Sequence, residues 1–197
     1  MQGEPRTMIE HGEPAASPAP AEGLPIRLAT PADAPAIEAL MALAIPALLA
    51  PFLTPRQIAA SFAVMGLDTQ LIADGTYFLI HAGAQLVGCG GWSRRATLYG
   101  GNHTAGRDAR LLAPATEAAR IRAMYTHPGF VRRGIGRRLL DASERAARSE
   151  GFTRAVLSAT LGGEPLYRAC GYRETGRTVD QGVPLVVMEK QIGAGGQ

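Results

Sequence analysis

The amino-acid sequence predicts a mixed α/β domain, with a mostly antiparallel sheet, one parallel pair of strands and helices on both faces. Residues 119–126 have the two-residue period of a strand, and they precede an amphipathic helix over 134–150 and a strand over 155–159. A strand, a helix and a strand in this order most simply form a right-handed crossover between parallel strands. Residues 77–82 and 85–92 are separated only by Gly83 and Ala84, which indicates an antiparallel hairpin.

The first part of the chain is predicted to run strand, helix, helix. Residues 1–24 are rich in Pro, Ala, Glu and Gly without apolar periodicity, so we expect a disordered tail ahead of a domain over residues 25–197. Residues 25–29 read as a short strand. Thr30 and Pro31 are suited to cap and begin a helix, and an apolar linker then reaches Leu53. The stretch Thr54-Pro55-Arg56-Gln57 has the form of a capping box and predicts a second helix.

The second part is predicted to begin with the hairpin and to continue through a long polar segment over 93–116. Segments of that length are usually functional or disordered. The period of the next strand predicts two faces, with Ala119, Ile121, Ala123 and Tyr125 on one and Arg120, Arg122, Met124 and Thr126 on the other. After the 134–150 helix we expect a short helix over 164–170 and closing strands over 172–176 and 183–190. The exposed strand edge near the C-terminus leaves a homodimer open.

Composition excludes several classes of protein. The net charge of +3 is too small to imply nucleic acid by itself, and the arginines gather at one helix start instead of spreading along a face. The longest apolar stretch, residues 41–53, contains two prolines and falls short of a membrane span, and the N-terminus does not resemble a signal peptide. Cys89 and Cys170 have no metal-binding spacing and are predicted to be small core residues, so we expect no metal site and a cytoplasmic protein.

The segment with the clearest chemistry is Arg132-Arg133-Gly134-Ile135-Gly136, between the 119–126 strand and its helix. Backbone N–H groups at a helix start lack internal partners, and the helix dipole adds positive potential there. Glycines allow a phosphate to approach that backbone, and Arg132, Arg133 and Arg137 add charge-assisted donors. The combination predicts a pyrophosphate site. A Walker A loop is excluded because no Gly-Lys-Ser/Thr follows, and the third glycine of a dinucleotide fingerprint is absent.

Residues 120–172 closely resemble the GNAT acetyltransferase superfamily. The matching segments are Thr126-His127-Pro128, then Arg132-Arg133-Gly134-Ile135-Gly136, and a short helix that carries Tyr167 before Gly171-Tyr172. Two departures stand out. Val131 occupies the position of the family's Arg or Gln, so Arg132 and Arg133 are expected to supply that charge. Thr160 corresponds to the Asn that often contacts the pantetheine arm.

The resemblance implies an N-acetyltransferase that moves an acetyl group from acetyl-CoA directly to a primary amine, across two parallel strands that splay apart. It implies cofactor binding by Met124, Tyr125, Thr126, Arg132, Arg133, Gly134, Ile135, Gly136, Arg137 and Thr160. Tyr167 corresponds to the tyrosine that protonates the departing thiolate.

Three matters stay open at this stage. The general base is undetermined: Glu117 is the nearest carboxylate in sequence, ordered water is an alternative, and His81 and His103 are less favoured. Arg120 and Arg122 fit either recognition of an acidic acceptor or a solvent-facing edge. The acceptor, a small molecule or a peptide, is not identified, and a non-catalytic acyl-CoA sensor is the alternative function.

Overall fold

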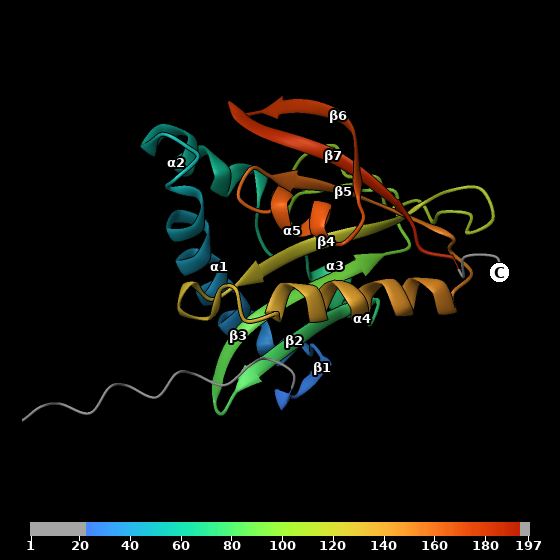
Figure 1. Ribbon diagram of the computed structural model, residues 1–197, viewed down its shortest axis with the longest axis horizontal. Helices are drawn as coiled ribbons and strands as arrows, with labels where there is room; N and C mark the ends of the chain where they lie inside the picture. The colour runs from blue at the N-terminus through green and yellow to red at the C-terminus, as the bar shows by residue number, and fades with distance from the viewer. Residues whose placement is uncertain (1–22, 194–197) are drawn as a thin grey trace, which may run out of the picture.

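The structure, a computed structural model, describes residues 23–193 and consists of a seven-stranded sheet with helices on both faces (Figure 1). The strands are β1 (Ile26–Leu28), β2 (Tyr77–Ala82), β3 (Gln85–Ser93), β4 (Ala119–Thr126), β5 (Arg154–Thr160), β6 (Arg173–Asp180) and β7 (Val183–Gln191). The helices are α1 (Ala34–Leu49), α2 (Pro55–Val64), α3 (Thr69–Ala73), α4 (Ile135–Ser149) and α5 (Glu164–Ala169). The short 3-10 turns η2 (Pro31–Asp33) and η3 (Pro128–Phe130) precede α1 and α4. The predicted N-terminal tail lies outside the described residues, except for Gly23 and Leu24.

The order of the strands is β1-β2-β3-β4-β5-β7-β6, and only β4 and β5 pair in parallel. Strand β7 lies between β5 and β6, so β6 forms one edge of the sheet. The predicted fold class is confirmed. The homodimer suggested by this edge stays a prediction.

Two sets of buried side chains hold helices on opposite faces of the sheet. Residues of α1, α2 and α3 form one core cluster with Leu79 and Cys89, whereas Leu140 and Ala147 of α4 and Tyr167 of α5 pack in a second cluster with Trp92. Figure 1 shows α4 lying across one face of the sheet. The lone tryptophan is therefore a buried core residue, 1% exposed, rather than a pocket wall.

Helix α1 continues further than the sequence indicates. It runs through Pro46 to Leu49, where the sequence indicated an apolar linker, although proline removes one helical N–H donor. The stretch Pro31–Leu49 is long and apolar enough to cross a membrane by length and composition alone. Its buried stripe, from Ile37 to Leu49, packs instead in the core beneath the sheet, as in a core helix of a globular domain.

The segment between β3 and β4 is more regular than a structureless loop. Arg95 and Leu111 form an isolated antiparallel bridge, and Thr97 N–H donates to the Asp108 carbonyl at 3.0 Å. The segment therefore leaves the sheet, turns and returns. Residues 98–100 at its far end reach the cavity described below.

The predicted two-face alternation of β4 is wrong beyond Arg122. Ala123 has a φ of 51°, and the register with β3 shifts between Cys89 and Gly91. This β-bulge exchanges the faces: Met124 packs with the cluster that contains Ile121, and Tyr125 packs on the α1 side with Ala123. A period of two cannot reveal an inserted residue, because each half of the strand alternates correctly.

Candidate active site

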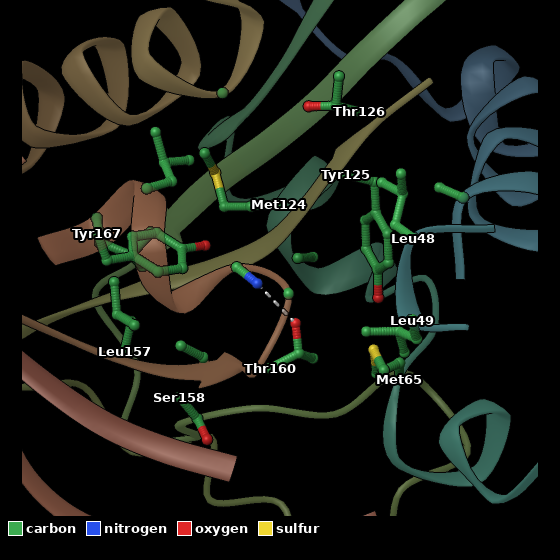
Figure 2. Close-up of a pocket in the computed structure, with 18 of the residues that line it drawn as sticks. Leu48, Leu49, Met65, Met124, Tyr125, Thr126, Leu157, Ser158, Thr160 and Tyr167 are labelled. Carbon is green, nitrogen blue, oxygen red and sulfur yellow. Dashed lines mark hydrogen bonds between the residues drawn. The ribbon is translucent and has the colours of Figure 1, made fainter. Parts of the chain in front are cut away.

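A large cavity lies where β4 and β5 separate. The two strands pair only at Ala119 with Ala155 and Arg120 with Val156, and then diverge. Residues 121–126 of β4 and 157–160 of β5 line a cavity of about 740 Å³ that continues to the start of α4. Figure 2 shows the side chains around it. A splayed parallel pair therefore creates the cavity, as expected.

The backbone of β4 presents unpaired polar groups to this cavity. Tyr125 pairs with Cys89 of β3, and His127 N–H donates to the Val87 carbonyl at 2.9 Å. Because alternate residues of a strand direct their backbone groups to opposite sides, the N–H and C=O groups of Met124 and Thr126 face the gap toward β5. Beyond Arg120, no strand in the described part of the chain pairs with this edge of β4, because β5 diverges from it. An extended ligand in the gap can satisfy these groups.

The other end of the cavity is closed by the start of α4. Gly134 has a φ of 87° and precedes the helix, and Arg138 N–H makes the first helical hydrogen bond, to the Gly134 carbonyl. The N–H groups of Ile135, Gly136 and Arg137 therefore lack helical partners and lie at the positive end of the helix dipole. The side chain of Arg137 also lines the cavity. This arrangement is suited to bind an anion, and we call it the anion site.

The arginines of the loop do not all serve this site. Arg132 lines the cavity and has a φ of 62°, a left-handed conformation that is uncommon outside glycine. Arg133 does not line it: the guanidinium lies 4.6 Å from the centre of the Phe130 ring and donates to the Gly129 carbonyl. One guanidinium nitrogen of Arg133 therefore braces the loop, whereas its Nη1 is buried without a hydrogen-bond partner among the described residues. Arg132 and Arg137 are the two loop arginines that line the cavity.

Tyr167 reaches the cavity from α5. Its side chain is 8% exposed, and Figure 2 shows its hydroxyl directed into the cavity. Burial, and to a smaller extent Cys170, raises the pKa of Tyr167, so the phenol stays protonated through the neutral range. Thr160 lies on the same side of the cavity, beside Gly163, where its hydroxyl accepts from Gly163 N–H at 3.2 Å and fixes the turn into α5. Tyr167 is thus a protonated donor beside the strand gap.

Glu117 is not brought to the cavity. It precedes β4 and forms a two-contact ion pair with Arg110, at 2.9 and 3.0 Å. Arg110, and then the Ala113 N–H group, lowers the pKa of Glu117 to about 2. A carboxylate held this way does not accept a proton near neutral pH. The structure therefore gives no support to Glu117 as the general base.

We expect the Glu117→Gln variant to keep kcat/KM within about twofold of wild type, because a group that neither lines the cavity nor accepts a proton contributes nothing to proton transfer. Steady-state thiol release from acetyl-CoA between pH 6 and 9 measures this. A loss of 100-fold together with a vanished acidic limb of the pH profile would restore Glu117 as the base.

The remaining candidate bases also lie elsewhere. Among the described residues that line the cavity, none carries a carboxylate, an imidazole or a thiol. The His103 ring contacts the Ala63 carbonyl, and Cys89 is buried with its pKa raised to about 12, chiefly by burial. None of Glu117, His81 and His103 lines the cavity, so ordered water stays the expected proton acceptor.

Sequence reasoning missed the buried ion pair that supports the wall opposite Tyr167. Asp68 and Arg122 are both 2% exposed and pair at 2.9 Å. Arg122 also donates to the carbonyls of Thr97 and Gly100, both at 2.8 Å. Arg122 is therefore neither a solvent-facing edge residue nor a free receptor for an acidic group, and Arg120 is half-buried and donates to Ala96. An arginine in the middle of a buried strand is the signal that could have found the pair.

The fold and this cavity can be compared with known proteins. A model of the acetyltransferase (GNAT) family matches residues 38–172, which is more than half of the chain. The chain belongs to the GNAT family. Members of this family use acetyl-CoA as the acyl donor. No curated protein gives a significant match to this chain.

Several solved structures share the GNAT fold. A GCN5-related N-acetyltransferase from Rhodopseudomonas palustris has a TM-score of 0.62 and 20% identity, over 85% of this chain and 95% of that chain. An N-acetyltransferase, PaiA, from Thermoplasma acidophilum, solved in complex with coenzyme A, has a TM-score of 0.60 and 14% identity, over 86% of this chain and 99% of that chain. The ribosomal-protein-S18-alanine N-acetyltransferase from Escherichia coli has a TM-score of 0.53 and 15% identity, over 88% and 97% of the two chains. At these identities the likeness is one of fold.

Proposed function

We propose that this GNAT protein transfers an acetyl group from acetyl-CoA directly to a primary amine of a small molecule or peptide. One arrangement carries the proposal: the gap between β4 and β5 joins the anion site at the start of α4 to the hydroxyl of Tyr167. A diphosphate-bearing thioester spans such a gap with its phosphates at one end and its acyl group at the other. When bound, acetyl-CoA supplies the activated acyl group.

The residues at the start of α4 fit a pyrophosphate. A Cβ atom added to Gly136 would lie 2.8 Å from Leu166 Cδ2 and 3.9 Å from Thr126 Oγ1, so this glycine keeps open the passage between α4, α5 and the end of β4. Two arginines line the same end, and no carboxylate lines the cavity among the described residues. Unpaired N–H donors and cationic side chains attract a multiply charged anion, and no lining carboxylate among the described residues repels it.

Each part of the site has a distinct task in this function. The backbone of Met124 and Thr126 orients the pantetheine arm as an added strand, and an N–H of this edge polarises the acyl carbonyl. Tyr167 donates its proton toward the thiolate as the amine displaces it. Water accepts the proton that the amine loses.

The alternative, a sensor that binds acyl-CoA without turnover, requires the anion site but gives no task to Tyr167. The direction of the phenol into the cavity favours the enzyme. Thiol release in the presence of amines separates the two functions: binding of acetyl-CoA without release by any amine class would favour the sensor.

We expect the Gly136→Val variant to bind acetyl-CoA at least about tenfold more weakly than wild type, a change of about 1.4 kcal/mol or more. The branched side chain would enter the passage beside Leu166. Isothermal titration with acetyl-CoA measures the change, and thermal unfolding checks the fold. Gly176→Val is the matched control, because no atom lies within 4 Å of a Cβ at that position of β6. Equal affinity of Gly136→Val and wild type would contradict this placement of the cofactor.

A further inference from the structure

The part of the cavity that is lined by α1, α2, the 98–100 segment and β7, which we call the acceptor end, is apolar. Its walls come from the last turns of α1 and the loop after it, the end of α2 and the residues after it, the 98–100 segment and β7. The residues are Ala44, Ile45, Leu48, Leu49, Phe52, Val64, Met65, Gly66, Leu98, Tyr99, Gly100 and Leu185. Figure 2 shows Leu48, Leu49 and Met65 gathered around the Tyr125 ring, across the cavity from Tyr167.

The polar groups at the acceptor end are already engaged. Tyr125 packs its ring there, and its hydroxyl lies beside the Gly66 backbone. The Arg122 guanidinium is occupied by Asp68 and by two carbonyls. Burial, and then an interaction with the Asp180 carboxylate, raises the pKa of the Tyr99 phenol, and Asp180 does not line the cavity. No anionic side chain among the described cavity residues therefore faces an incoming amine.

This environment selects against an ammonium ion. A cation that enters an apolar pocket loses its hydration without gaining a counter-ion, and burial therefore favours the neutral amine. An alkylamine with a lysine-like pKa of about 10.4 is uncharged in only about one molecule in a thousand at pH 7.5. The cavity also lacks a side-chain base that could remove the excess proton. An acceptor that is already neutral needs no counter-ion, and it needs no side-chain base to deprotonate it before attack; water can accept the proton that it loses afterwards.

We propose that the acceptor is an apolar aromatic amine that is uncharged at neutral pH. This inference rests on the proposed function and names its substrate class. The amine nitrogen bonds to the acyl carbon, the carbon–sulfur bond breaks, and the thiolate takes the proton of the Tyr167 hydroxyl. The nitrogen releases one proton to water, from which Tyr167 is reprotonated, so the products are the N-acetyl arylamine and free thiol.

The test compares two amines of nearly equal shape and opposite charge state, p-toluidine and 4-methylcyclohexylamine. We expect p-toluidine to bind the protein saturated with CoA at least about tenfold more tightly at pH 7.5, by isothermal titration. Its affinity should stay constant from pH 7 to 9, whereas that of 4-methylcyclohexylamine should rise with pH as its neutral fraction grows. Thiol release from acetyl-CoA should show the same preference in KM.

A matched pair of variants tests the charge argument directly. Phe52 lines the cavity and is 47% exposed, whereas Phe62 on α2 is 44% exposed and does not line it. Phe52→Glu places a carboxylate at the acceptor end and should shift the affinity ratio toward 4-methylcyclohexylamine at least about tenfold. Phe62→Glu adds the same charge outside the cavity and should leave the ratio unchanged.

Several outcomes would overturn the inference. The first is equal or tighter binding of 4-methylcyclohexylamine by wild type. Loss of that binding in the Asp180→Asn variant would show that the Asp180 carboxylate is the counter-ion of the ammonium. The second is the absence of saturable p-toluidine binding. The third is a preference for hexanoyl-CoA over acetyl-CoA, which would show that the acceptor end binds the acyl chain of the donor. Acetylation of charged amines alone would overturn the inference while the proposed function stands. Failure to bind acetyl-CoA would overturn the proposed function itself.

Discussion

Replacement of Tyr167 by phenylalanine is expected to lower kcat about 100-fold and to leave the affinity for acetyl-CoA unchanged. A positioned general acid contributes roughly 10²–10⁴ in rate, and the change removes only the hydroxyl from a ring that packs in the core. Titration calorimetry gives the affinity, and thiol release at saturating amine gives kcat.

The direction of the pKa shift sets the protonation state of Tyr167, although by itself it makes the phenol a weaker acid. Burial raises the pKa of Tyr167, and for a phenol a raised pKa means that the neutral, proton-bearing form persists to higher pH. The same desolvation raises the proton affinity of a thiolate formed beside it, so the transfer is not opposed by the environment. The rate should therefore show no basic limb from Tyr167 in the neutral range.

Tyr172→Phe is the control for this experiment. Tyr172 stacks edge-on against Tyr167, with ring centres 5.9 Å apart, but does not line the cavity. Its loss of a hydroxyl should leave kcat within about threefold, because no proton transfer depends on it. Equal rates for Tyr167→Phe and wild type would remove Tyr167 from the chemistry, and a parallel loss of acetyl-CoA binding would make its role structural.

Asp68→Asn is expected to lower the free energy of unfolding by about 3–5 kcal/mol, the range for breaking a buried ion pair from one side. The substitution leaves the buried Arg122 guanidinium without its counter-ion, and it weakens the contact with Arg107 as well. Denaturant unfolding monitored by tryptophan fluorescence measures the change. The 98–100 segment, which Arg122 holds through Gly100, should loosen at the same time and raise the KM for the amine.

The partner substitution and a surface control sharpen this result. If Asp68 acts through Arg122, the double variant Asp68→Asn/Arg122→Gln should be less destabilised than the sum of the single variants. Asp108 lies in the segment between β3 and β4 and has an exposed side chain, so Asp108→Asn should change the free energy of unfolding by less than about 1 kcal/mol. Additive effects of the two buried substitutions would contradict the coupling.

Local patterns in the sequence were sufficient for most of the fold. The Thr54 capping box forms as predicted, with Gln57 N–H bonded to the Thr54 hydroxyl, and Gly83 takes the positive φ that the hairpin turn requires. The five-residue helix α3 was not predicted, since so short an element has no periodicity to detect. The continuation of α1 past Pro46 was also not predicted, because it depends on tertiary packing of the helix.

What the sequence by itself determined is the anion site, because its donors belong to one continuous stretch: the N–H groups at the start of α4 and the neighbouring glycines and arginines. What only the tertiary structure decided is the acceptor end. The ion pair of Asp68 with Arg122 and the apolar wall around Met65 join residues that are far apart in the chain. The structure also shows that Glu117 pairs with Arg110 and does not line the cavity. Whether a charged side chain serves a site or an ion pair depends on its distance to a partner, and that distance is set by how the sheet and helices pack.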